Sequence, residues 1–143
     1  MTTTKAVKQL VESKETTKII SDHLKKYDKK KYDSIIKSCS KISKKIDALL
    51  SLYLGKQDKR QGITRNPENS VMRRLSTASM YVLTRKTGIS STEINLMNQV
   101  REELKNALTK TNDFFGGEWI EFKSNIEGQT IPVFKEVKNL KLE

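Results

Sequence analysis

The sequence predicts an all-α fold, an antiparallel four-helix bundle with an extended C-terminal tail. Apolar residues recur at helical spacing along most of the 143-residue chain, and only two Pro and six Gly interrupt them. The chain length is that of one domain, 1–143, and short links between helices favour antiparallel neighbours. We expect helices near residues 5–27, 31–54, 67–86 and 91–127, a loop at 55–66 and a tail at 128–143.

The segment from residue 31 to residue 54 has the strongest helical pattern. Its apolar residues are spaced alternately by three and four, which places them on one stripe of a helix. We expect this stripe to be core: Tyr32, Ile35, Cys39, Ile42, Ile46, Leu49 and Tyr53. The preceding segment is weaker because Thr16 to Lys18 interrupt its apolar pattern. The link at 28–30 has neither Gly nor Pro, so a hairpin turn and a bent continuous helix both remain possible.

Local signals predict where the third and fourth helices begin. Asn66 and Pro67 suit an N-cap and a first helical position, and Gly88 suits the end of the helix that follows. Ser90 and Glu93 have the spacing of a capping box, so the fourth helix should begin directly after Ser90.

The apolar stripe of the fourth helix continues across the pair Gly116-Gly117. Two interior glycines cost roughly 2 kcal/mol relative to Ala, which is less than the burial of large aromatic side chains returns. The sequence therefore predicts a kinked but continuous helix. Its expected core residues are Leu104, Leu108, Phe115, Trp119 and Phe122. Phe114 lies off this stripe, so we expect it to be exposed and available to a partner.

The chain is strongly basic, with a formal net charge of +11 at pH 7, of which residues 1–60 carry +9. The segment 25–33 repeats a Lys-Lys-Tyr-Asp unit, whose lysines could grip a nucleic-acid backbone while its tyrosines stack on bases. The candidate contacts are Lys25, Lys26, Lys29, Lys30 and Lys37. Lysines opposite an apolar stripe are also typical of a solvated face, and Lys recognises phosphate less specifically than Arg. A solvent face is the simpler interpretation.

The sequence contains few residues of the types that catalytic and metal-binding sites use. There is one His, His23, and one Cys, Cys39, and the Cys occupies a predicted core position. We expect five of the acidic residues of the last predicted helix to pair with Lys105 or Lys123 rather than to form a glycosidase-like acid pair. These residues are Glu102, Glu103, Glu118, Glu121 and Glu127. We therefore predict that the chain is not an enzyme and binds no cofactor or metal.

Membrane and export signals are also absent from the sequence pattern. No apolar run approaches the roughly 18 to 20 residues of a membrane helix, and the first five residues do not resemble a secretory signal. We expect no membrane association, and the sequence leaves localisation and oligomeric state open.

Several motifs resemble a known C-terminal region. They are Gln61-Gly62-Ile63-Thr64-x-Asn66-Pro67, Thr87-Gly88-Ile89, Thr111-Asn112-x-Phe114-Phe115-x-x-x-Trp119 and Pro132-x-Phe134-Lys135. The chain resembles, over roughly residues 30 to 138, the tail of large bacterial β-propeller proteins, mostly from Bacteroidetes, of the Vps10/sortilin-like or BNR-repeat glycosyl-hydrolase-like kind. The resemblance implies an all-helical accessory domain that follows a propeller, and it carries no catalytic residue to this chain.

The expected function is a non-catalytic accessory domain with a structural or protein-interaction role beside a propeller or another protein. The alternative is a basic module that binds nucleic acid or another polyanion through the Lys25 to Lys45 region.

Overall fold

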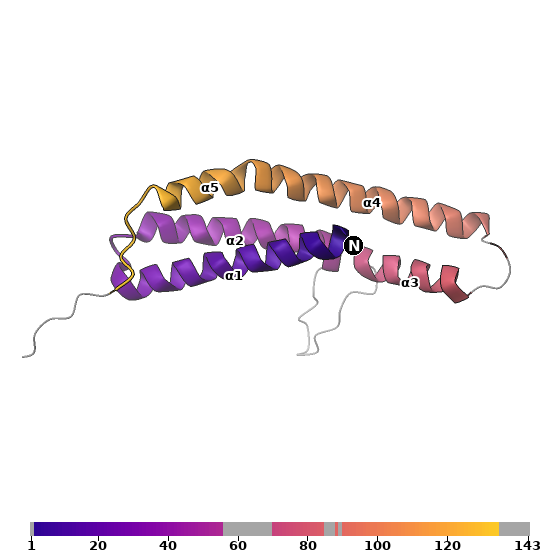
Figure 1. The fold of residues 1–143 in the computed structure, drawn as a ribbon, viewed down its shortest axis with the longest axis horizontal. Helices are drawn as coiled ribbons and strands as arrows, with labels where there is room; N and C mark the ends of the chain where they lie inside the picture. Colours follow the sequence, from indigo (N-terminus) through magenta and orange to yellow (C-terminus); the bar gives the residue numbers. More distant parts are fainter. Residues whose placement is uncertain (1, 56–69, 85–87, 89, 135–143) are drawn as a thin grey trace, which may run out of the picture.

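The computed structural model describes residues 2–55, 70–84, 88 and 90–134, and within these ranges the chain is all-α. The helices are α1 (Thr2–Asp28), α2 (Asp33–Leu54), α3 (Val71–Thr84), α4 (Ser91–Gly116) and α5 (Glu118–Glu127) (Figure 1). They confirm the predicted fold class and occupy the four predicted helical regions. Most of the predicted 55–66 loop and the tail beyond residue 134 lie outside the described residues.

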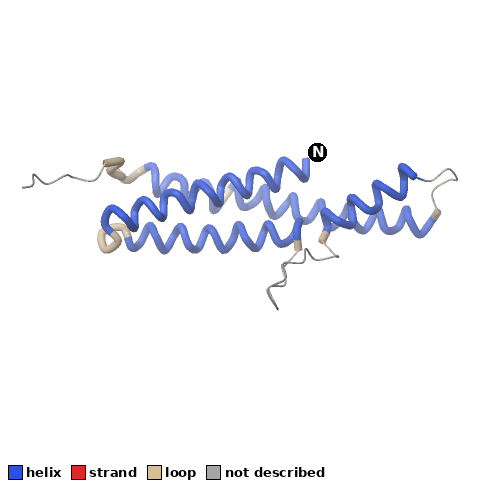
Figure 2. Tube along the Cα trace, turned by 90° about the horizontal axis from the view of Figure 1, so that it is seen from below, coloured by secondary structure: helices blue, strands red, loops and turns tan. Residues whose placement is uncertain are grey.

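The helices form an elongated antiparallel bundle with a stagger along its axis. α1 and α2 make a hairpin, and α4 with α5 runs back along both of them. α3 lies beyond the end of α2 and packs on the first half of α4, and it makes no contact with α1 (Figures 1 and 2). We call the part built by α1, α2, the second half of α4 and α5 the three-helix section, and the part built by α3 and the first half of α4 the two-helix section.

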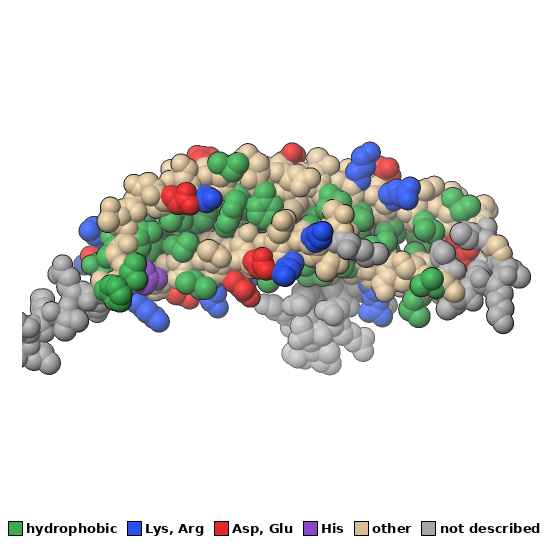
Figure 3. All heavy atoms as spheres, in the orientation of Figure 1, with side chains coloured by type: hydrophobic (Ala, Val, Ile, Leu, Met, Phe, Trp, Pro, Cys, Tyr) green, Lys and Arg blue, Asp and Glu red, His purple; other side chains and the backbone are tan. Residues whose placement is uncertain are grey.

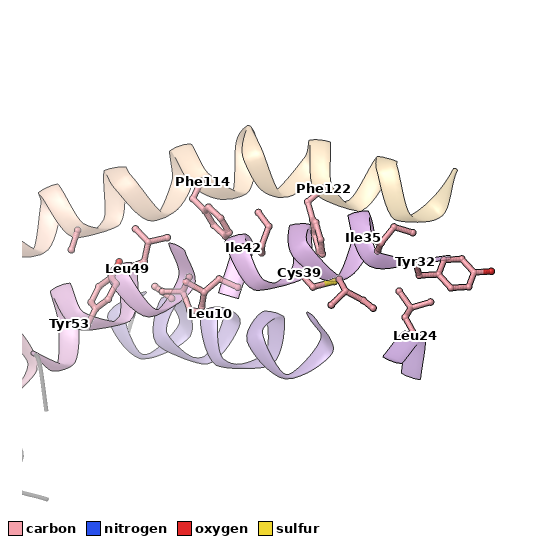
Figure 4. Close-up of a cluster of buried hydrophobic side chains, with 14 residues drawn as sticks. Leu10, Leu24, Tyr32, Ile35, Cys39, Ile42, Leu49, Tyr53, Phe114 and Phe122 are labelled. Atoms are coloured by element: carbon pink, nitrogen blue, oxygen red, sulfur yellow. The ribbon is translucent and has the colours of Figure 1, made fainter. Parts of the chain in front are cut away.

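The predicted stripe of α2 is the centre of the core (Figure 4). All seven of its residues, from Tyr32 to Tyr53, are buried. α1 faces this stripe with Thr3, Leu10, Thr17 and Leu24, which are buried and seven residues apart. Thr17 fits the core because its hydroxyl donates to the carbonyl oxygen of Ser13 at 2.8 Å. The weak apolar pattern of α1 is therefore a seven-residue repeat in which two threonines take core positions.

The link between α1 and α2 is a hairpin turn, which settles the alternative that the sequence left open. Asp28 Oδ1 accepts hydrogen bonds from the backbone N–H groups of Lys30 and Lys31, both at 3.1 Å. Local side-chain bonds of this kind are typical of turns because they replace the helical backbone bonds. The residue that reverses the chain is therefore an aspartate, in a link without Gly or Pro.

The described part of α3 begins later than the sequence predicts. Ser70 is not helical, and its Oγ accepts a hydrogen bond from the backbone N–H of Arg73 at 3.2 Å, which is an N-cap interaction. The predicted cap at Asn66 and Pro67 lies outside the described residues. At the start of α4, by contrast, the predicted capping box between Ser90 and Glu93 is present in both directions.

The predicted continuous last helix is wrong, because it is interrupted at Gly117. This residue has φ −122° and ψ −90° and separates α4 from α5, whose backbone bonds resume with Glu121 N–H donating to the carbonyl of Gly117 at 3.1 Å. In an unbroken helix, Phe114 and Phe122 would point about 80° apart. The break allows both to be buried against α2 (Figure 4).

The predicted exposure of Phe114 is also wrong, since only 7% of this residue is exposed. The core-facing residues of α4 are Val100, Ala107, Thr111 and Phe114, with Leu104 partly buried between them. Their spacing alternates between four and three, as a helix packed along a partner requires. The sequence interpretation placed Phe115 on the stripe and Phe114 off it, which is one residue too far along the helix.

The other predicted core residues of α4 and α5 divide into two groups. Phe122 is buried, as expected. The remaining four are partly buried and pack against the edge of the core: Leu104, Leu108, Phe115 and Trp119.

Candidate interaction surfaces

The two-helix section carries an apolar groove between α3 and α4. It has a volume of about 370 Å³ and is lined mainly by Leu75, Ala78, Ile94, Met97, Val100 and Leu104. Ile94 is 48% exposed and Met97 40%, and Leu83 at the end of α3 is 84% exposed. These side chains are exposed because α1 does not reach α3, so no described helix takes the third position that α1 occupies in the other section.

A second groove runs between α1 and the α4–α5 layer, along the seam where hydrophobic side chains gather in Figure 3. It has a volume of about 440 Å³. Trp119 and Phe115 form its apolar wall, while Gln9, Glu12 and Asn112 supply polar side chains. The rings of Phe115 and Trp119 meet edge to face with centroids 5.9 Å apart, so the two rings pack on each other in this wall.

The lysines that the sequence singled out are all exposed. Lys25 and Lys26 end α1, Lys29 and Lys30 lie in the turn, and Lys37 lies on α2. The structure therefore brings these five cations to one end of the bundle (Figure 1). Lys37 also pairs with Asp33 at 2.6 Å, and the hydrogen bond and charge of Asp33 raise the pKa of this lysine.

The tyrosines between these lysines are not arranged for base stacking. Tyr32 is 5% exposed, and Tyr27 is partly buried with its ring centroid 6.3 Å from that of Tyr32. A stacking platform needs an accessible ring face. The pairing of basic and aromatic residues that the sequence suggested is therefore present in the chain but not on its surface.

The start of the C-terminal tail is attached to α1 through His23. Nε2 of His23 lies 2.8 Å from the carbonyl oxygen of Pro132, so it donates the proton of this hydrogen bond. Ile131 packs against the core, whereas Val133 and Phe134 are 74% and 86% exposed.

Several of the groups considered for catalysis are buried or paired. The thiol of Cys39 is buried in α2, and burial raises its pKa. Three of the acidic residues form ion pairs, Glu118 with Lys45, Glu103 with Arg74 and Glu127 with Lys123. Within the described ranges, no group of three or more His, Cys, Asp or Glu side chains could hold a metal ion.

Sequence reasoning missed the apolar groove of the two-helix section. Ile94 and Met97 have the spacing of core residues, and periodicity alone cannot distinguish a covered apolar face from an uncovered one. The only available signal was the uneven length of the helices, since the predicted third helix is shorter than the fourth.

Comparison with known proteins gives no relative: no protein family, curated protein or solved structure matches the chain. The resemblance to the helical tail of Vps10/sortilin-like, BNR-repeat propeller proteins therefore stays a prediction.

Proposed function

We propose that the chain is a non-catalytic helical module that binds another protein through the apolar groove of the two-helix section. The groove itself carries this proposal. Ile94 and Met97 form a half-exposed row that lines the groove together with the partly buried Leu75 and the buried Val100, and no described helix covers this row. Covering such a row gains free energy in proportion to the apolar area removed from water.

The partner that fits is a protein surface with an apolar ridge, such as an amphipathic helix. In the three-helix section, α1 packs on the α2–α4 pair through residues seven apart. A partner helix in the corresponding position beside α3 and α4 would extend the same packing. Arg101 lines the groove, so acidic residues along the partner helix would complement it. A propeller domain, as the sequence resemblance implies, is the first partner to test.

Site-specific photo-crosslinking in the native cells tests this proposal. A photoreactive phenylalanine analogue replaces Met97 in the groove, and in a control chain it replaces Ser40, which is exposed on α2. We expect a discrete crosslinked protein at Met97, none at Ser40, and loss of the Met97 product when Ile94→Asp is added. A product of twice the chain mass would identify a second copy as the partner. The analogue is also placed, one position at a time, at Ile94 and at Leu75. If none of the three groove positions gives a crosslink, the proposal is wrong.

The alternative function, binding of a polyanion through Lys25 to Lys45, has the exposed lysines in its favour. The burial of Tyr32 argues against nucleic acid as that polyanion, because base stacking would have to come from other residues.

A further inference from the structure

The end of the bundle formed by the α1–α2 turn is rich in positive charge. Residues 18–45 contain ten lysines, three aspartates and no other charged residue. Two of the aspartates are engaged locally, Asp28 in the turn and Asp33 with Lys37. The lysines of the turn are exposed and outnumber the aspartates, so this end presents a net positive charge to solvent.

Exposed apolar side chains are held at the same end. The hydrogen bond between His23 and Pro132 fixes the tail against the last turns of α1, and the exposed Val133 and Phe134 follow directly. The Cα atom of Phe134 lies no more than about 7 Å from that of Pro132. Lys26 follows His23 by three residues, on the same side of α1. The lysines and the apolar pair are therefore exposed at the same end of the bundle.

We propose that this end of the bundle binds the surface of an anionic lipid bilayer. The lysine ammonium groups interact with the negatively charged headgroups, and their aliphatic stems lie along the interface. Val133 and Phe134 enter the boundary between headgroups and acyl chains, where an aromatic ring is favoured. The two-helix section, at the other end of the molecule, would then point away from the bilayer. This inference does not depend on the proposed protein partner.

An anionic bilayer fits these residues better than nucleic acid. Residues 1–55 contain no Arg, the side chain that makes bidentate contacts with phosphate and guanine. Tyr32 is buried, so it cannot stack on bases. A nucleic-acid surface also has no apolar layer that would accept the exposed Val133 beside Phe134.

The proposal differs from the expectation of no membrane association, which rested on the lengths of apolar runs. None of the described helices has the length and apolar character to cross a bilayer. Peripheral binding requires no such helix, because charge and a small inserted apolar group act at the surface.

Vesicle sedimentation with the full chain tests the proposal. We use phosphatidylcholine vesicles with and without about 30 mol % phosphatidylserine, at about 50 mM salt. We expect binding only to the anionic vesicles. One variant changes Lys25, Lys26, Lys29 and Lys30 to Gln, and its control changes the exposed Lys5, Lys44, Lys105 and Lys110 to Gln. Each lysine near the surface contributes about fivefold in affinity, so the first variant should bind at least a hundredfold more weakly and the control far less so.

A second pair of measurements tests the apolar contact. Changing both Val133 and Phe134 to Ser should weaken vesicle binding about tenfold or more without changing the net charge. In a variant with Trp119→Phe and Phe134→Trp, the single Trp should shift its emission to the blue on addition of anionic vesicles.

Three results would overturn the proposal. They are no binding of the parent chain to anionic vesicles, equal losses in the two lysine variants, and no response to the changes at Val133 and Phe134. Binding of a DNA or RNA oligonucleotide that is lost in the Lys25 variant, together with absent vesicle binding, would assign this end to nucleic acid instead. Circular dichroism of each variant shows whether the fold is kept.

Discussion

Tyr53 of α2 and Thr111 of α4 share a hydrogen bond of 2.7 Å inside the core. Thr111 Oγ1 also donates to the carbonyl oxygen of Ala107 at 2.8 Å, which uses its only proton, so the hydroxyl of Tyr53 is the donor to Thr111. The exposed fractions of Tyr53 and Thr111 are 0% and 2%. The bond therefore joins the last turn of α2 to α4 and leaves neither hydroxyl unpaired.

Breaking this pair from its two sides should have unequal effects. Tyr53→Phe removes a donor and leaves Thr111 bonded to Ala107, so it should cost about 0.5–1.5 kcal/mol of unfolding free energy. Thr111→Val leaves the buried Tyr53 hydroxyl unpaired and should cost about 1–3 kcal/mol. Urea unfolding of both variants and of the double variant measures these values. If the costs of the two single variants add up to the cost of the double variant to within about 0.5 kcal/mol, the hydrogen bond is contradicted.

Stability should fall at alkaline pH because Tyr53 is buried. Burial raises the pKa of Tyr53, while its hydrogen bond with Thr111 lowers it by less. The neutral form is therefore favoured in the folded state, and its contribution is complete below the unfolded-state pKa of about 10 and is lost as pH rises through the folded-state value. Urea midpoints above pH 9 should decline more steeply for the parent chain than for Tyr53→Phe. Parallel curves would contradict this prediction.

The thiol of Cys39 should react only when the bundle opens. Cys39 is 1% exposed, and burial raises its pKa, so the reactive thiolate is rare in the folded chain. Labelling with a thiol reagent at pH 8 should be slow in buffer and fast in urea, in step with unfolding measured by circular dichroism. Rapid labelling under native conditions would show that α2 does not bury this side chain. Ser40→Cys, at an exposed neighbouring position, provides the fast control.

Phe114 should contribute more to stability than either neighbouring aromatic residue on the edge of the core. Phe114→Ala empties a buried site and should cost about 3–5 kcal/mol. Phe115 and Trp119 are only partly buried, so their Ala variants should cost less, about 2 kcal/mol or under. The free energies of unfolding in urea give the order of the three variants. If Phe115→Ala lowers the free energy of unfolding more than Phe114→Ala does, the prediction from the sequence that Phe115 is the core residue is correct.

The two glycines at the break between α4 and α5 should respond differently to Ala. A Cβ atom on Gly116 meets nothing within 4 Å, so Gly116→Ala should stabilise the helix by about 0.5–1 kcal/mol. A Cβ atom on Gly117 would lie 3.2 Å from the carbonyl oxygen of Asp113, so Gly117→Ala should give no gain or a loss. Thermal unfolding of the two variants provides the comparison. If both variants gain equally in thermal stability, α4 and α5 can join into one helix.

Much of the fold could be predicted because it depends on local patterns. The alternating spacing from Tyr32 to Tyr53 identifies the buried side of α2, and the spacing of Ser90 and Glu93 identifies the start of α4. The exposure of Lys37 also followed from its position opposite the apolar stripe of α2. Helix periodicity and capping act within a few residues, so the sequence displays them directly.

The errors come from positions where more than one local choice was possible. After Thr111, steps of three and four both reach a phenylalanine, and only the position of α2 decides that Phe114 is the buried one. The pair Gly116-Gly117 could continue the helix or break it, and the break is what allows Phe122 as well as Phe114 to reach the core.

The sequence by itself determined which segments are helical, where the fourth helix begins, and which side of α2 is apolar. The tertiary structure decided that α3 lies beyond α2 and not beside α1, and this stagger leaves Ile94 and Met97 exposed in a groove. It also decided that the tail returns to His23, which leaves the exposed Phe134 at the same end of the bundle as the lysines of the first turn. The reason is that periodicity fixes the direction in which an apolar face points, whereas the element that covers this face depends on contacts between residues far apart in the chain.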